Sequence, residues 1–410
     1  MTEADVVLDD PQRSPSASGV SPRRTRIESV DVLRGIIMIL MALDHTRDFF
    51  GNAAVNPTDP ATTTVPLFFT RWVTHICAPG FFLLTGVGAA LTLRRLSRGE
   101  LARFLFTRGL WLIFLEIVIV RDLGWQFNFD YRLTVLNVLW ALGWAMIFLS
   151  ALLRLPAWMV TAIGAVMIAT HNLLDGVQAA SLGRLAPLWN VLHAPGVVLD
   201  DSRHVVFLAY ALIPWIGVTA VGYGLGEVYR WEPERRRRFL LQLGLAAVAA
   251  FLVLRTLNFY GDPRHVHAAG PPQMPYFMRF INTNKYPASL DFLLMTLGPT
   301  ILLLPLAERA RGKIGEFFST FGRVPMFYYL LHIPTIHFAA LLVSLARQGR
   351  LEPWLFANHP AMVPPAPDGY RWPLLLLYAV FILVVAVLYF PCRAYARKKA
   401  TDPSGWMRYI

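Results

Sequence analysis

Long apolar segments alternate with polar connections along most of the 410-residue chain. An apolar run of about 20 residues is long enough to cross a bilayer as a helix. We read such runs near residues 30–49, 69–93, 101–120, 133–153, 156–173, 205–229, 238–258, 288–308, 324–346 and 372–395. The pattern predicts an all-α, polytopic transmembrane bundle of about ten spans, which we expect to form one domain over residues 28–397.

The connections between these segments alternate in charge. One set is strongly basic and includes SPRRTRIES, RRLSRGELAR, YRWEPERRRRF, AERARGK and RAYARKK. The other set is longer, richer in Pro, Gly and aromatic residues, and much less basic. Basic connections stay in the cytoplasm, so both termini are predicted to be cytoplasmic. Residues 1–27 are Pro/Ser-rich without an apolar core and predict a disordered tail, and residues 398–410 form a second cytoplasmic tail.

Composition supports a membrane protein and narrows its partners. The chain is 55% hydrophobic and 16% charged, whereas an ordinary soluble domain has about 25% charged residues. The net charge of +12 would suggest nucleic acid in a soluble protein. Here the run Arg235 to Arg238 is better placed to contact lipid headgroups, so we expect membrane lipids and no nucleic acid as partners. Cys77 and Cys392 lie far apart in or beside apolar spans, which predicts neither a disulfide nor a metal site.

Ionisable residues inside the predicted spans are the functional candidates, because charge in a membrane is costly. The stretch DVLRGIIMILMALDHTRDFF has an apolar middle, with Arg34 near its inner end and His45 in its outer part. On a helix these two residues lie roughly 16 Å apart. The inner layer of the bundle holds Arg34, Arg108 and Arg323, and the outer layer holds proton-exchanging side chains, namely His45, His75, Glu116, Lys285, Asp291 and His337.

This layering suits a site that takes an anionic donor from the cytoplasm and an acceptor from outside. Arginines bind phosphates, and histidine serves as a general base near neutral pH. Structural interpretations stand beside this one. Arg34 could anchor the helix at the cytoplasmic membrane surface and pair with Asp31. His45 could cap the outer end of the helix against Asp44 or Asp48. The polar side chains of other spans could be contacts between helices.

Four segments carry a resemblance to a known family. They are SVDVLRGIIMILMALDHTRDFF, HICAPGFFLLTGVGAAL, NKYPASLDFLLMTLGP and FGRVPMFYYLLHIPTIH, in this order within residues 29–337. The spacing of Arg34 and His45 resembles the first-helix signature of membrane-bound acyltransferases. Together the four segments resemble the bacterial relatives of heparan-α-glucosaminide N-acetyltransferase. The resemblance implies a protein of the bacterial inner membrane that moves an acetyl group from cytoplasmic acetyl-CoA to a sugar or glycan on the other side.

The resemblance also implies roles for residues. Arg34 would bind CoA on the donor side, where Arg108 and Arg323 would add positive charge, and Asn284 with Lys285 matches the Asn-Lys element of the family. Known acceptors of the family carry a terminal glucosamine amine, and its members tend to dimerise, so a homodimer is a further expectation.

One loop departs from the family pattern. Eukaryotic members are assigned an active histidine after the first catalytic-domain helix, but residues 51–71 contain none. His45 or His75 must then serve, and we favour direct transfer. His45, oriented by Asp44 or Asp48, would deprotonate the acceptor. Lys285 or Asn284 would stabilise the oxyanion.

Other functions fit parts of the same pattern. A proton-coupled transporter or flippase of a lipid-linked or acidic solute would also use intramembrane His, Glu and Arg side chains. A b-type haem protein would use pairs among His45, His75, His332 and His337. The acceptor could be an amino sugar, a sugar hydroxyl or a small amine, and residues 174–204 and 270–286 are the expected recognition segments.

Overall fold

The computed structural model describes residues 28–51, 55–59, 61–125, 129, 131–201, 203–264, 275–356, 370, 372–401 and 407. This part of the chain is mostly helical. The longer helices are α1 (Glu28–Phe50), α3 (Cys77–Thr92), α4 (Arg98–Phe114), α5 (Val138–Leu152), α6 (Ala157–Thr170), α8 (Leu212–Glu227), α9 (Pro233–Leu257), α11 (Leu290–Ala307), α13 (Pro325–Gln348) and α14 (Leu374–Thr401). The shorter ones are α2 (Val65–Val73), α7 (Ala186–Leu192), α10 (Tyr276–Ile281) and α12 (Gly312–Arg323).

Six helical segments of the described residues are long and apolar enough to cross a membrane. They are Val65–Thr92, Ala157–Leu174, Pro233–Leu257, Leu290–Ala307, Pro325–Gln348 and Leu374–Thr401. Val65–Thr92 joins α2 and α3 through a single 3-10 turn, Thr74–Ile76. Each of the ten predicted spans overlaps one of the longer helices, so the helical prediction is confirmed at this level. The number of membrane crossings and the side on which the termini lie stay predictions.

A small sheet corrects the all-α prediction. Strands β1 (Leu133–Leu136), β2 (Gly196–Asp200) and β3 (Val205–Leu208) form a three-stranded sheet in the order β1-β3-β2. The β1–β3 pair is parallel, and the β2–β3 pair is antiparallel. β1 and β3 occupy the first residues of segments that we read as spans, at 133–153 and 205–229. Short runs of Val, Leu and Phe fit a strand as well as a buried helix, so hydropathy alone joined them to the helices that follow.

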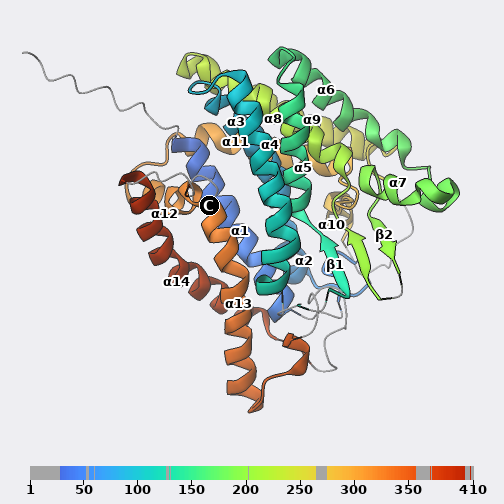
Figure 1. The fold of residues 1–410 in the computed structure, drawn as a ribbon, viewed down its shortest axis with the longest axis vertical. Helices are drawn as coiled ribbons and strands as arrows, with labels where there is room; N and C mark the ends of the chain where they lie inside the picture. Colours follow the sequence, from blue (N-terminus) through green and yellow to red (C-terminus); the bar gives the residue numbers. More distant parts are fainter. Residues whose placement is uncertain are drawn as a thin grey trace, which may run out of the picture.

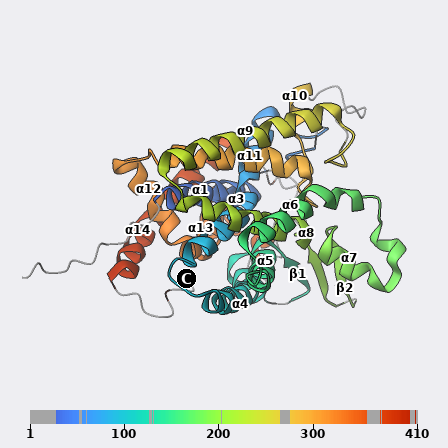
Figure 2. The ribbon, with the colours of Figure 1, turned by 90° about the horizontal axis from the view of Figure 1, so that it is seen from above.

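Helix α1 lies in the middle of the molecule. Figure 1 shows it with α12 and α14 on one side and α4 and α5 on the other, and Figure 2 shows α9 beside α11 along one edge. Side chains around the whole α1 circumference are buried, for example Leu33, Ile37 and Ala42. Charged residues on α1 therefore meet protein, or a cavity within it, instead of lipid.

Close packing fixes the start of α1 against α12. A Cβ added at Gly35 would lie 1.8 Å from the carbonyl oxygen of Phe318, and one added at Gly322 would lie 1.8 Å from that of Asp31. Small residues allow the backbones of membrane helices to approach this closely. Arg34 is thereby placed against the last turn of α12.

Candidate active site

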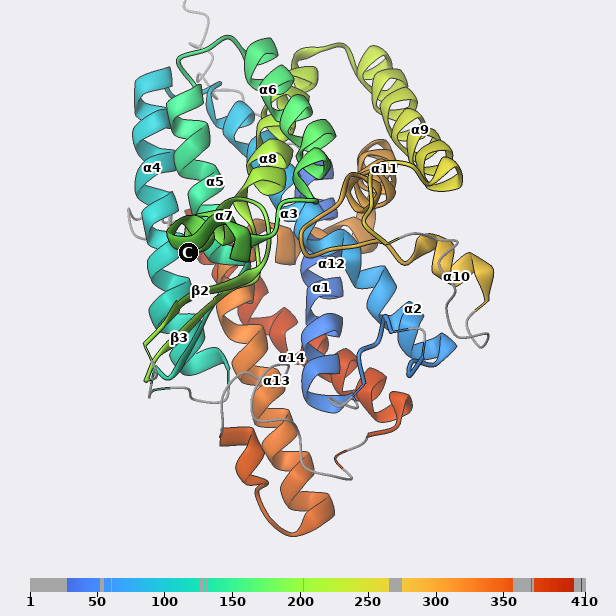
Figure 3. The same ribbon diagram turned by 90° about the vertical axis from the view of Figure 1, so that its right-hand side faces the viewer.

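A cavity of about 660 Å³ lies at the other end of α1, between this helix, the start of α3, the sheet and the loop before α11. Polar and charged side chains line much of it, namely Asp44, His45, Arg47, Asp48, Asn56, Thr58, Arg71, His75, Asn137, Arg264, Thr283 and Lys285. Aromatic side chains complete the wall, namely Phe81, Phe207, Tyr210, Tyr286 and Tyr329. Figure 3 shows β2, β3 and α7 together on the side of the molecule where this cavity lies. The cavity is large enough for a small-molecule substrate.

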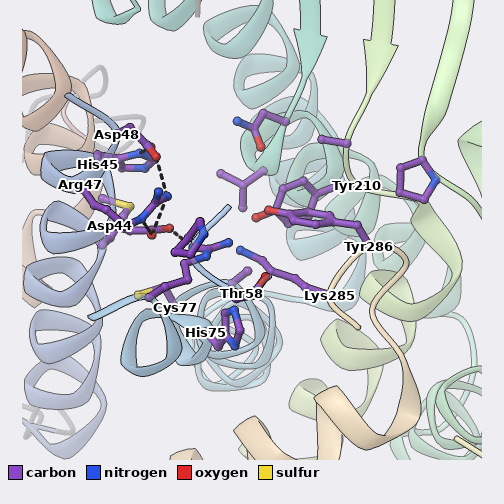
Figure 4. A pocket seen from close by; sticks show the side chains of 18 of the residues that line it. Asp44, His45, Arg47, Asp48, Thr58, His75, Cys77, Tyr210, Lys285 and Tyr286 are labelled. Carbon is purple, nitrogen blue, oxygen red and sulfur yellow. Dashed lines mark hydrogen bonds and ion pairs between the residues drawn. The ribbon is translucent and has the colours of Figure 1, made fainter. Parts of the chain in front are cut away.

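The last turns of α1 carry a network of paired charges. Arg47 Nη2 lies 2.5 Å from Asp48 Oδ1, and Arg47 Nε lies 3.4 Å from Asp44 Oδ1. Arg71 of α2 forms a further ion pair with Asp44. Residues three or four apart share one face of a helix, which is why Asp44, Arg47 and Asp48 can meet. The network ties α1 to α2 and places both carboxylates at the cavity wall, as Figure 4 shows.

His45 is held in one orientation by its neighbours. Its Nδ1 lies 3.3 Å from Asp48 Oδ2. A carboxylate only accepts hydrogen bonds, so Nδ1 carries the proton, and Nε2 of the neutral ring is a base. The His45 ring also meets the Trp125 ring edge-on, at 5.0 Å between centroids, and lies 5.2 Å from the ring of His332. Asp48, and not Asp44, is therefore the carboxylate that contacts His45.

His75 lies in the same cavity but in a different environment. It belongs to the 3-10 turn between α2 and α3 and is 3% exposed. Its ring meets the edge of Phe292 at 5.4 Å, and its Nδ1 has no hydrogen-bond partner among the described residues. No carboxylate of the described residues makes a hydrogen bond that orients His75, so it fits the role of a general base less well than His45.

Lys285 faces these residues from the opposite wall, beside Tyr210 and Tyr286 (Figure 4). Its Nζ lies 5.0 Å from the ring centroid of Tyr286 and 5.7 Å from that of Tyr210. Burial raises the pKa of the Tyr286 phenol, but the nearby cations Lys285 and Arg71 lower it by more, so the net pKa lies below its ordinary value. The wall is thus aromatic and cationic.

Asn284, the other half of the Asn-Lys element, does not line the cavity. Its side chain donates to the carbonyl oxygen of Pro287 at 3.1 Å, and its backbone N–H donates to Asp262 at 2.7 Å. Asp262 also accepts from the Ser289 hydroxyl at 2.7 Å. These contacts shape the turn that carries Lys285. Asn284 therefore helps to position Lys285 and does not itself face the cavity.

A buried arginine that sequence reasoning missed supports the same wall. Arg255 is 1% exposed and donates to the backbone carbonyls of Arg264, Arg279, Phe280 and Asn282. Its Nη1 lies 3.8 Å from carboxylate oxygens of both Asp262 and Asp291. Asp291, a candidate from the sequence, is therefore part of this buried cluster. The partners of Arg255 lie in several separate segments of the chain, so no local sequence pattern indicates this cluster.

The predicted donor residues lie at the α12 end of α1 or away from it. Arg34 donates to Asp31 Oδ1 at 3.1 Å and to the Gly322 carbonyl at 3.2 Å. Arg323 is the last residue of α12, and its Nε is buried without a partner among the described residues. Arg108 lies on α4, which packs chiefly against α5, and its guanidinium lies 5.9 Å from the Phe104 ring centroid. The structure brings Arg34 and Arg323 into one region and leaves Arg108 on a different helix pair.

Two outer-layer candidates make structural contacts. Glu116 accepts the backbone N–H of Leu139 at 2.8 Å, at the start of α5. His337 lies 2.7 Å from the carbonyl oxygen of Leu355. Among the described residues, no group of three or more His, Cys, Asp or Glu side chains could hold a metal ion. Of the recognition segments expected from sequence, residues 270–274 lie outside the described part of the chain, and Tyr286 lines the cavity.

Comparison with known families decides the class of protein. Residues 26–261 match the model of a family described as heparan-alpha-glucosaminide N-acetyltransferase, catalytic. The chain belongs to this family. The match covers more than half of the sequence, and no curated protein matches the chain. The family resemblance drawn from the four sequence segments is confirmed.

The N-acetyltransferase family match includes only part of the site. Arg34, His45 and His75 fall within residues 26–261, whereas Lys285 and Arg323 lie beyond them. The cavity combines both parts, because the loop before α11 lies opposite the last turns of α1. The sequence of this family member lacks a histidine in residues 51–71. In the described part of the cavity wall, His45 and His75 are the histidines available.

Proposed function

We propose that this protein is a transmembrane acyltransferase of a bacterial inner membrane. It moves an acetyl group from cytoplasmic acetyl-CoA to an amino or hydroxyl group of an extracytoplasmic sugar or glycan. In this proposal the domain of residues 28–397 crosses the membrane about ten times, as the recurring apolar runs of roughly 20 residues predict, and both termini are cytoplasmic. Membership of the acetyltransferase family supports the reaction class.

The observation that carries the proposal is the pair of His45 and Asp48 at the wall of a cavity. A carboxylate that holds Nδ1–H leaves Nε2 free to take a proton, which is the arrangement that general bases use in acyl transfer. Membership of the family supports acyl transfer, and the cavity brings a base, a cation and aromatic rings to one small space.

The proposed step is direct transfer. The acceptor oxygen or nitrogen attacks the thioester carbonyl carbon, and His45 Nε2 takes the proton from the attacking atom. The oxyanion of the tetrahedral intermediate lies beside the ammonium group of Lys285, which stabilises it. The C–S bond then breaks, the acyl group stays on the acceptor, and the proton passes from His45 to the thiolate sulfur to give CoA.

The donor binds in this proposal along α1. Arg34 and Arg323 hold CoA phosphates at the α12 end, because guanidinium groups match phosphate geometry. Arg108 adds positive charge on the same side of the bundle. The thioester must reach His45, which lies roughly 16 Å further along the helix. An elongated donor with its charge at one end and its reacting bond at the other suits this separation.

Acceptor recognition is proposed at the opposite wall. Tyr210 and Tyr286 offer ring faces on which a sugar could stack, and Asn137, Thr58 and Thr283 offer hydrogen-bonding groups. Aromatic rings with a few convergent polar groups are usual in ligand pockets. The other proposed partners are the lipids around the bundle and a second copy of the chain, with which it would form a homodimer.

A thermal-shift titration of the detergent-purified protein with acetyl-CoA and CoA tests the donor site. A ligand that binds only the folded state raises the melting temperature with concentration. We expect a rise in wild type that is lost in Arg34→Ala. The absence of any rise, at concentrations well above cellular levels, would favour the transporter or flippase, which the intramembrane His, Glu and Arg residues also support.

A further inference from the structure

His332 is a second buried histidine beside His45. It lies on α13, is 0% exposed and stacks on Tyr328 of its own helix, with ring centroids 5.6 Å apart. Its centroid lies 5.2 Å from that of His45 on α1. His332 does not line the cavity, so any part that it plays must act through His45.

The hydrogen bonds of His332 fix its tautomer. Its Nδ1 lies 2.5 Å from the backbone carbonyl oxygen of Tyr329. A carbonyl oxygen only accepts, so Nδ1 carries the proton, and Nε2 of the neutral ring is a bare acceptor. This Nε2 is buried and has no hydrogen-bond partner among the described residues. A buried acceptor without a donor costs free energy and calls for an explanation.

The resting His45 ring cannot supply the missing donor. Its Nδ1–H is engaged by Asp48, and its Nε2 is itself an acceptor while the ring is neutral. Once His45 takes a proton, however, Nε2 carries an N–H. Two imidazole rings joined by an N–H···N bond of about 2.9 Å have centroids about 5 Å apart, because each nitrogen lies about 1.1 Å from its ring centre. The observed separation of 5.2 Å, with the ring planes inclined by 50°, leaves room for such a bond, which His332 Nε2 does not make in the resting structure.

We infer that His332 is a positioning residue that accepts a hydrogen bond from protonated His45 and stabilises the imidazolium during acyl transfer. This inference rests on the proposed function. The acceptor proton moves to His45 Nε2. While the tetrahedral intermediate exists, this N–H makes a bifurcated hydrogen bond to the reacting atoms in the cavity and to His332 Nε2, and the proton then returns to the leaving thiolate. His332 gains and loses no proton over the full cycle. A hydrogen bond that forms only in the charged state stabilises the transition state and leaves substrate binding unchanged.

Two variants of equal side-chain length test this role. His332→Gln keeps a strong hydrogen-bond acceptor, and His332→Met fills similar space but leaves only a weak thioether acceptor. We expect His332→Met to lower kcat about 10- to 100-fold, the usual worth of a hydrogen bond to a charged group. The KM values for acetyl-CoA and for the acceptor should stay within about twofold, and His332→Gln should retain kcat within about threefold of wild type. Melting temperatures of both variants report folding.

Each alternative outcome is decisive. Equal kcat values for the two variants, or a loss confined to KM, would overturn the role of His332 while transfer by wild type and its loss in His45→Ala keep the proposed function. No acetyl-CoA turnover by wild type would overturn the proposed function, and the role of His332 with it. If His332→Met does not fold, His332→Phe replaces it as the variant without an acceptor, because it preserves the stacking on Tyr328.

Discussion

The two ends of α1 handle charge in different ways. At the sheet end, Arg47 and Arg71 balance the charges of Asp44 and Asp48, and the ring of His45 is held beside them by Asp48. At the α12 end, Arg34 contacts Asp31 and a backbone carbonyl of α12, next to Arg323. Balanced charge around a histidine suits proton transfer, whereas arginines in excess suit an anion. The comparison predicts that substitutions at the sheet end change kcat and that those at the α12 end change KM for the donor.

The largest effect is expected for His45→Ala. Removing the general base should lower kcat by about 1000-fold or more, because general-base catalysis contributes about 10² to 10⁴. The matched control is His75→Ala, which removes a histidine from the same cavity and should retain most activity. The measurement is acetyl-CoA-dependent CoA release with purified protein. Full activity in His45→Ala together with loss in His75→Ala would assign the base to His75.

The sequence was sufficient to predict how far apart Arg34 and His45 lie along α1, because the rise per residue of a helix sets that distance. It could not choose between Asp44 and Asp48, since both lie within one turn of His45 and their pairing depends on Arg71 of another helix. Nor could it find Arg255, whose partners lie in other segments of the chain. Strands β1 and β3 were missed because each has only four residues and comes just before a helix of similar hydropathy.

Asp48→Asn should have the next largest effect. The amide keeps the size of the side chain but can donate as well as accept, so it no longer fixes the proton on Nδ1 of His45. We expect kcat to fall about 100-fold with KM for acetyl-CoA unchanged. Asp44→Asn is the comparison, because Asp44 contacts arginines instead of His45. Steady-state kinetics of the two variants, with acetyl-CoA varied, decide which carboxylate serves the base. An equal loss in both would mean that the whole charge network matters.

Arg34→Lys tests the other end of α1. Lysine keeps the positive charge but lacks the planar fork that binds phosphate with two hydrogen bonds. We expect KM for acetyl-CoA to rise about tenfold, the equivalent of about 1.4 kcal/mol, while kcat stays within about twofold. Initial rates over a range of acetyl-CoA concentrations give both values. A fall in kcat at unchanged KM would place Arg34 with the reacting groups and would remove the distinction between the two ends.

The smallest effect is expected for Arg108→Gln. The sequence predicts Arg108 in the same inner layer as Arg34 and Arg323. In the structure, its helix α4 packs chiefly on α5, and its guanidinium lies over the Phe104 ring. Because Arg108 lies on this separate helix pair, we expect its charge to act on CoA phosphates only through long-range electrostatics. Salt screens such interactions. KM for acetyl-CoA should therefore rise less than about threefold, and the rise should disappear at high ionic strength. A rise as large as that of Arg34→Lys, insensitive to salt, would extend the donor site from the start of α1 across to α4.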